Sequence, residues 1–98
     1  MNITIKSIHF TADLKLEQFI ENKLNKLKQY DDRIIGANVF LRLVKNQELE
    51  NKTTEIKLEF PGTELFAKKQ SNSFEKSTDS VVEALKKQLQ KFKEKQKQ

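Results

Sequence analysis

Four short segments of the chain alternate hydrophobic and polar residues with a period of two, the pattern of strands that bury one face. These segments are 2–8, 37–44, 53–60 and 64–68, with a polar loop expected over 45–52 and a Pro-Gly turn at 61–62. The last three follow one another along the chain, so we expect them to form an antiparallel meander with one face open to solvent.

Two longer segments place hydrophobic residues three and four positions apart, which predicts amphipathic helices. The first runs roughly from Ala12 to Gln29, with the Thr11 hydroxyl expected as its cap and Asp13 in its first turn. The second follows a Ser73 cap and continues without Gly or Pro into a lysine-rich end. The order β-α-β-β-β-α predicts an α+β fold: a four-stranded mixed sheet with its first two strands parallel and both helices on one face.

Length and composition narrow the class of protein. A chain of 98 residues is long enough for one domain, and the absence of cysteine excludes disulfides and thiolate metal sites. No apolar run approaches the roughly 20 residues of a membrane span, and residues 1–10 lack the charged and apolar parts of a secretory signal. We therefore expect a cytoplasmic protein that does not contact a membrane.

The residues that catalysis requires are scarce. The single histidine, His9, falls in a turn that is expected to be exposed, and Glu55 and Glu59 flank Lys57 on one strand face, a pattern typical of a solvated surface. Two carboxylates in that arrangement would bind a metal only weakly. We predict that the protein is not an enzyme and carries no cofactor or metal.

The charge of the chain is concentrated at its end. Lys and Arg number 19 against 14 Asp and Glu, a net charge of +5, and the whole surplus lies in residues 86–98. Within the second helix Lys87, Lys91 and Lys95 form one ridge, and Lys86, Lys93 and Lys97 form the opposite flank. Such a fork suits phosphates, but cations are also favoured at any helix C-terminus, and the spacing alone leaves both interpretations open.

Two further features have two readings each. Lys23 interrupts the apolar face of the first helix. In one interpretation its methylene chain covers the core and its ammonium group reaches solvent at the edge. In the other, the ammonium group joins the lysines of the second helix in one anion site. Phe40 and Phe66 are hypothesised to meet on the open sheet face as a two-aromatic patch, which is either a partner surface or ordinary cross-strand packing.

Taken together, the element order and three sequence runs resemble a known family. The runs are the start MNITI, the first-helix stretch ENKLNKLKQY and the second-helix stretch STDSVVEALKKQLQKFK. The chain resembles the ribosome hibernation promoting factors, also called ribosome-associated inhibitor or protein Y and formerly sigma-54 modulation proteins, which carry the S30AE domain. The resemblance implies a fold similar to a double-stranded-RNA-binding domain, and docking on the small ribosomal subunit where messenger and transfer RNA otherwise bind. Translation would be inhibited by occupancy, under stress or in stationary phase.

Family basic positions match Lys23 and Lys26 of the first helix and Lys87 and Lys91 of the second. Helical geometry adds Lys86, Lys93 and Lys95 as candidate contacts with ribosomal RNA. The chain also departs from the family pattern. Ser77 and Thr78 are more polar than the usual residues, Ala84 replaces a lysine, and Lys86 stands where an acid is common.

The chain ends at Gln98, so we expect a short form: one ribosome-binding domain over 1–98, without the C-terminal domain through which long members pair ribosomes. Short members either act with a separate ribosome modulation factor to make ribosome dimers or silence single ribosomes, and both outcomes stay open. We expect a monomer when the protein is off the ribosome. The alternative functions are a protein-interaction module that uses the exposed sheet face and a general binder of double-stranded RNA.

Overall fold

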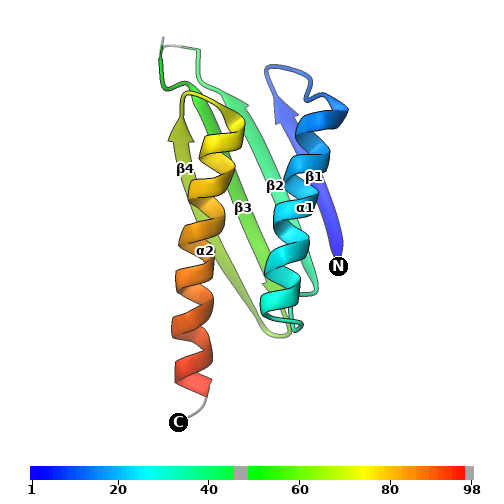
Figure 1. The fold of residues 1–98 in the computed structure, drawn as a ribbon, viewed down its shortest axis with the longest axis vertical. Coiled ribbons are helices and arrows are strands. Elements are labelled where there is room, and N and C mark those ends of the chain that lie inside the picture. The colour runs from blue at the N-terminus through cyan, green and yellow to red at the C-terminus, as the bar shows by residue number, and fades with distance from the viewer. Residues whose placement is uncertain (46–48, 97–98) are drawn as a thin grey trace.

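The computed structural model describes residues 1–45 and 49–96 and confirms the predicted order of elements (Figure 1). The elements are β1 (Asn2–Ile8), α1 (Leu14–Tyr30), β2 (Gly36–Leu43), β3 (Lys52–Phe60), β4 (Thr63–Ser71) and α2 (Phe74–Gln96). The loop predicted for 45–52 connects β2 to β3, but its residues 46–48 lie outside the described part of the chain.

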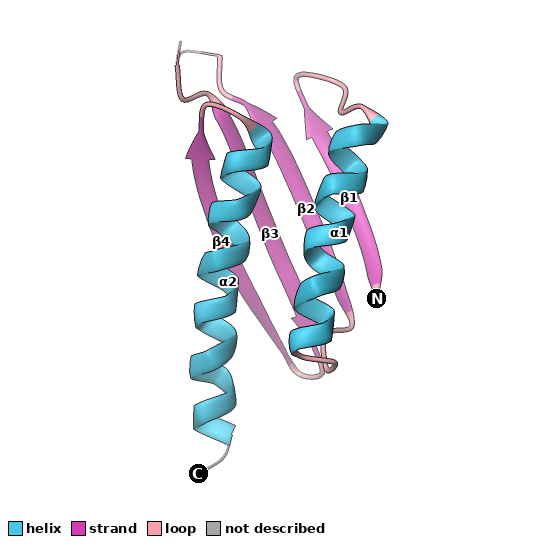
Figure 2. Cartoon of the chain, in the orientation of Figure 1, coloured by secondary structure: helices cyan, strands magenta, loops and turns pink. Residues whose placement is uncertain are grey.

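The four strands form one sheet in the order β1-β2-β3-β4, with β1 parallel to β2 and the other neighbours antiparallel. Figure 2 shows both helices on the same side of this sheet, as predicted, running side by side in the same direction. The C-terminal end of α2 extends past the ends of the strands. The fold therefore has a helical face, where the two helices are neighbours, and an open sheet face.

The helix starts show which polar side chain caps each helix. The carboxylate of Asp13 accepts a hydrogen bond from the Leu16 backbone N–H at 2.8 Å, so Asp13 and not Thr11 is the cap, and α1 begins at Leu14. The prediction of Thr11 was wrong because the chain first turns away from β1 through His9, which adopts a left-handed conformation with φ of 71°. The predicted Ser73 cap is confirmed: its hydroxyl accepts from the Lys76 N–H at 3.1 Å.

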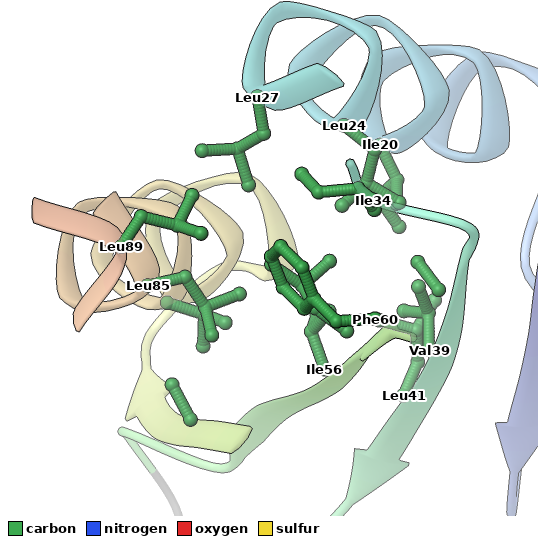
Figure 3. Close-up of a cluster of buried hydrophobic side chains, with 14 of the residues drawn as sticks. Ile20, Leu24, Leu27, Ile34, Val39, Leu41, Ile56, Phe60, Leu85 and Leu89 are labelled. Carbon is green, nitrogen blue, oxygen red and sulfur yellow. The ribbon is translucent and has the colours of Figure 1, made fainter. Parts of the chain in front are cut away.

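The core fills the space between the sheet and the two helices (Figure 3). Residues of the inner strand faces, such as Val39, Ile56 and Leu58, meet Leu24 of α1 and Leu85 of α2. All five are at most 1% exposed. Burial of each such side chain contributes about 1.5–3 kcal/mol, so this contact fixes how the helices lie on the sheet.

A buried cluster of hydroxyl groups explains the polar residues at the start of α2. Thr54 points from β3 toward the helices, and its hydroxyl lies 2.7 Å from the Ser77 hydroxyl and 3.3 Å from that of Thr78. Ser77 also donates to the Phe74 carbonyl at 3.2 Å. All three hydroxyl residues are at most 1% exposed, and each has a partner, so their burial carries no unsatisfied polar group.

Candidate nucleic-acid interface

The side-by-side arrangement of the helices determines which candidate lysines meet. Lys23 of α1 lies opposite Asp79 of α2. About two helical turns further along α1, Tyr30 lies opposite Lys86 and Lys93 of α2. These contacts define the interhelical groove, by which we mean the outer surface between Lys23, Asp79, Tyr30, Lys86 and Lys93. It is the first of two lysine-bearing surfaces on the helical face.

The position of Lys23 fits the first of its two sequence interpretations better than the second. Its side chain is 32% exposed, and the ammonium lies 5.3 Å from the centre of the Phe19 ring. The ammonium reaches the interhelical groove, but there it forms an ion pair of 2.9 Å with Asp79, whose side chain is 51% exposed. The charge of Lys23 is therefore partly neutralised by the Asp79 carboxylate.

Tyr30, the last residue of α1, is in contact with two lysines of α2. The Lys93 ammonium donates to the Tyr30 carbonyl at 2.8 Å and lies 4.1 Å from the ring centre. The Lys86 ammonium lies 5.5 Å from the same centre. Cations are attracted to the face of an aromatic ring, so Tyr30 holds both ammonium groups on the groove side of α2.

The opposite flank of α2 faces β4, where a second surface with lysines lies. An open groove of about 550 Å³ is lined there by Lys69, Asp79, Ser80, Glu83, Ala84 and Lys87. The Gln88 amide donates to the Phe66 carbonyl at 2.8 Å and ties this flank of the helix to the strand. We call this the β4 groove. Lys86 and Lys93 on one side and Lys87 on the other agree with the predicted two flanks of α2, and Lys97, predicted on the flank of Lys86, lies outside the described residues.

Lys69 was missed by the sequence reasoning. Its cross-strand partner is Thr54, whose side chain faces the helices, so Lys69 lies on the helical side of β4. The signal was available, because the inward positions Leu65 and Ala67 continue to 69 with a period of two. The strand was predicted to end at 68, whereas β4 continues to Ser71.

The remaining candidate lysines, Lys26, Lys91 and Lys95, are exposed on the helices. Within residues 1–45 and 49–96, none of them forms an ion pair, and neither do Lys69, Lys86, Lys87 and Lys93. Of the seven candidates, Lys23 alone pairs with an acid in the part of the chain that the structure describes. The helical face therefore presents a set of ammonium groups that form no ion pair with the described residues.

The open sheet face is organised differently, because its charges pair with one another across strands. Glu55 lies 3.5 Å from Lys68 and 4.0 Å from Arg42, and Lys57 lies 3.6 Å from Glu64. Glu59 accepts a hydrogen bond of 2.8 Å from Asn38. Lys57 is exposed, as expected for a solvated surface, whereas the Glu55 side chain is only 17% exposed.

Phe40 and Phe66 do not form a joint patch on the open sheet face. Phe40 is in register with Glu55, and Phe66 is in register with Lys57. Strand β3 thus lies between them, which separates their strands by about 10 Å. The hypothesis that the two rings meet was wrong, because charged residues of β3 occupy the intervening positions.

The segment after α1 is anchored by a buried carboxylate. Asp31 accepts hydrogen bonds from the Arg33 guanidinium at 3.0 and 2.8 Å and from the Arg33 backbone N–H at 3.1 Å. The guanidinium lies 5.1 Å from the ring centre of Phe92 in α2. These bonds from Arg33 hold the pKa of Asp31 below its ordinary 3.8, although burial acts in the opposite direction and Lys93 adds a small favourable effect.

His9 and the acidic side chains were the candidates for acid–base and metal chemistry. His9 is exposed, as predicted, and in the part of the chain that the structure describes no three His, Asp or Glu side chains gather in a way that could hold a metal ion. Neither helix, over its described residues, has the length and apolar character needed to cross a membrane.

Comparison with known proteins identifies the relatives of this fold. The family model described as sigma 54 modulation protein / S30EA ribosomal protein, Ribosomal_S30AE, matches residues 3–97. The chain belongs to this family. The predicted resemblance is confirmed by this match.

Relatives of this S30AE chain include named ribosome hibernation factors. It is 32% identical to the ribosome hibernation promoting factor of Escherichia coli K12 over 98 residues, which cover 100% of this chain and 97% of that protein. It is 27% identical to the protein of the same name from Pseudomonas putida KT2440, over 98% of this chain and 90% of the relative. The Deinococcus radiodurans ribosome hibernation promotion factor is 34% identical over 80% of this chain, a match that spans only 41% of that longer protein.

Solved structures support the fold of this S30AE chain. A ribosomal subunit interface protein from Coxiella burnetii superposes with a TM-score of 0.84, at 22% identity, over 95% of this chain and 98% of that one. The N-terminal domain of Thermus thermophilus Protein Y gives a TM-score of 0.79 at 24% identity, over 94% and 99% of the two chains. The predicted α+β architecture is thus shared with both.

Proposed function

We propose that this chain is a ribosome hibernation factor of the cytoplasm that binds the small ribosomal subunit through its helical face. The names of its relatives refer to ribosome hibernation, and the match covers 90% or more of the length of two of these relatives. Occupying the sites of messenger and transfer RNA would inhibit translation under stress or in stationary phase. The protein does this by binding alone, without catalysis or a cofactor.

One observation carries the proposal: the two faces of the molecule treat charge differently. On the open sheet face, lysines and arginine pair with Glu55 and Glu64. On the helical face, six of the seven candidate lysines form no ion pair within the described residues. When such ammonium groups neutralise phosphates, the nucleic acid releases the counterions condensed on it. This release supplies a large share of the affinity of proteins for nucleic acids. The helical face therefore favours RNA, and the sheet face does not.

The candidate residues have different parts in this interface. Lys26, Lys87, Lys91 and Lys95 are exposed and suited to direct phosphate contacts. Lys86 and Lys93 reach RNA from the interhelical groove, held against Tyr30. Lys23 contributes less charge because Asp79 pairs with it. The absence of an aromatic ridge on the outer side of α2 favours recognition of phosphates and shape over stacking of bases.

A matched pair of charge-reversal variants tests the proposed face. The first changes Lys87, Lys91 and Lys95 to Glu, and the control changes Lys6, Lys57 and Lys68, exposed residues of the strands, to Glu. Both alter the net charge equally. Sedimentation with purified small subunits should be lost in the first variant and kept in the control, with circular dichroism verifying that both are folded. Equal binding of the two variants would contradict the helical face as the RNA surface.

Two further measurements separate the proposal from the alternatives. A protein-interaction module on the sheet face would lose its partner in the control variant only. A general binder of double-stranded RNA would bind a plain RNA duplex as tightly as small subunits, whereas a hibernation factor should prefer the subunit. A sucrose-gradient profile of stationary-phase lysate with the tagged protein would then distinguish ribosome dimers, which imply a separate modulation factor, from silenced single ribosomes.

A further inference from the structure

The β4 groove has a lysine on each wall, contributed by elements far apart in the sequence. Lys69 comes from β4, where its register with Thr54 directs it to the helical side. Lys87 comes from α2, and the hydrogen bond from Gln88 to the Phe66 carbonyl holds this helix flank against the strand. Ala84 lies between the walls with a short side chain, so the groove stays open.

The charges of the groove define what it can bind. Lys69 and Lys87 are exposed and form no ion pair within the described residues. Of the two acids in the groove, Asp79 pairs with Lys23 of α1 at 2.9 Å. The Ser80 hydroxyl adds a hydrogen-bond donor. Two lysines and a hydroxyl along an open groove suit a phosphodiester backbone. Glu83, which forms no ion pair within the described residues, opposes it, and Asp79 opposes it less because Lys23 pairs with it.

We propose that the β4 groove is a second phosphate-binding surface, with Lys69 as an additional RNA contact. It rests on the proposed function, because the RNA would be that of the small subunit. The interhelical groove lies on the other flank of α2, where Lys86 and Lys93 face α1. A helix with its side chains is about 10–12 Å wide, so α2 would lie between two backbone segments of folded RNA, one along each flank.

Neighbouring residues of β4 provide a matched test. Lys69→Gln removes a charge from the β4 groove, and Lys68→Gln removes one from the open sheet face, where Lys68 pairs with Glu55. Affinity for purified small subunits should fall severalfold for Lys69→Gln and stay unchanged for Lys68→Gln. The slope of log affinity against log salt should decrease by roughly 0.7–0.9 for the first variant only.

Glu83→Gln provides a test in the opposite direction. Removing the carboxylate that opposes RNA should tighten binding to small subunits severalfold, an effect that loss of folding would not produce. The proposal is overturned if Lys69→Gln binds like Lys68→Gln, or if Glu83→Gln leaves the affinity unchanged. In that case, loss of binding in the Lys87, Lys91 and Lys95 variant would still support the proposed function, whereas a wild-type chain that fails to bind small subunits would remove both.

Discussion

Lys93 and Tyr30 are joined twice, by a hydrogen bond from the ammonium to the Tyr30 carbonyl and by the position of the ammonium 4.1 Å from the centre of the ring. The carbonyl belongs to the last turn of α1, where backbone acceptors lack partners within the helix. A lysine of α2 thus satisfies the end of α1 and connects the two helices. Only one of its three donors is used in this bond, so the ammonium still carries its charge to the surface.

Replacing Tyr30 should separate the ring's effect on the lysines from the effect of its hydroxyl. Tyr30→Phe keeps the aromatic face and should change the free energy of unfolding by no more than about 0.5 kcal/mol. Tyr30→Ala removes the ring beneath Lys86 and Lys93 and should destabilise the fold by about 1–3 kcal/mol. Urea unfolding followed by circular dichroism measures both changes.

Binding to small subunits extends this test to the interface. Because the ring holds two ammonium groups in place, Tyr30→Ala should weaken binding severalfold at a temperature where the variant is fully folded, and Tyr30→Phe should bind like the wild type. Weakening in both variants would show that the hydroxyl, and not the aromatic face, is what the interface requires.

The hydroxyl cluster predicts a coupling between β3 and α2. Thr54→Val conserves shape but removes the partner of the Ser77 hydroxyl, 2.7 Å away in the buried interior. Leaving that group with fewer partners should cost about 1–3 kcal/mol of stability. Adding Ser77→Ala to Thr54→Val should cost less than the sum of the two single changes, because both partners are then apolar. Strictly additive costs, measured in a double-mutant cycle by urea unfolding, would contradict the coupling.

The order of strands and helices could be predicted from the sequence because each element follows from a local pattern of hydrophobic and polar residues. The inward positions of 53–60 and the apolar stripe of the second helix both survive in the structure as core positions, including Ile56, Leu58 and Leu85. The Thr11 cap failed because Thr11 and Asp13 are both suitable cap residues. In the structure the chain leaves β1 through the left-handed His9, and the Asp13 carboxylate is the one that accepts from the Leu16 N–H at the helix start.

The candidate site required information that lies between elements. The two lysine flanks of α2 follow from helical spacing, but the pairing of Lys23 with Asp79 depends on how α1 and α2 are offset along each other. Lys69 joins the helical face only because β4 continues past residue 68 beside α2. The separation of Phe40 from Phe66 follows from strand order, since a meander places β3 between them.

Acid should destabilise the fold through Asp31. Its pKa is lowered in the folded protein, chiefly by the hydrogen bonds from Arg33, so the stabilisation is present above the ordinary value of 3.8 and is lost as pH falls through the lower folded value. Asp31→Asn should be less stable than the wild type at pH 7, because the ionic hydrogen bonds weaken, and the difference should shrink below pH 3.8. Urea unfolding at a series of pH values measures it. A difference independent of pH would exclude this carboxylate as its source.

The dependence of small-subunit binding on salt should reveal which lysines carry an unneutralised charge. If about five phosphates are neutralised, log affinity should fall with log salt at a slope of roughly 3.5–4.5, taking 0.7–0.9 for each phosphate. Lys87→Gln should lower this slope by nearly one phosphate, because Lys87 has no acidic partner in the described residues. Lys23→Gln should lower it by less, since Asp79 already pairs with Lys23 and neutralises part of the charge that would meet a phosphate. A weak salt dependence in the wild type would favour the protein-interaction module, and equal slopes for the two variants would show that the RNA separates Lys23 from Asp79 on binding.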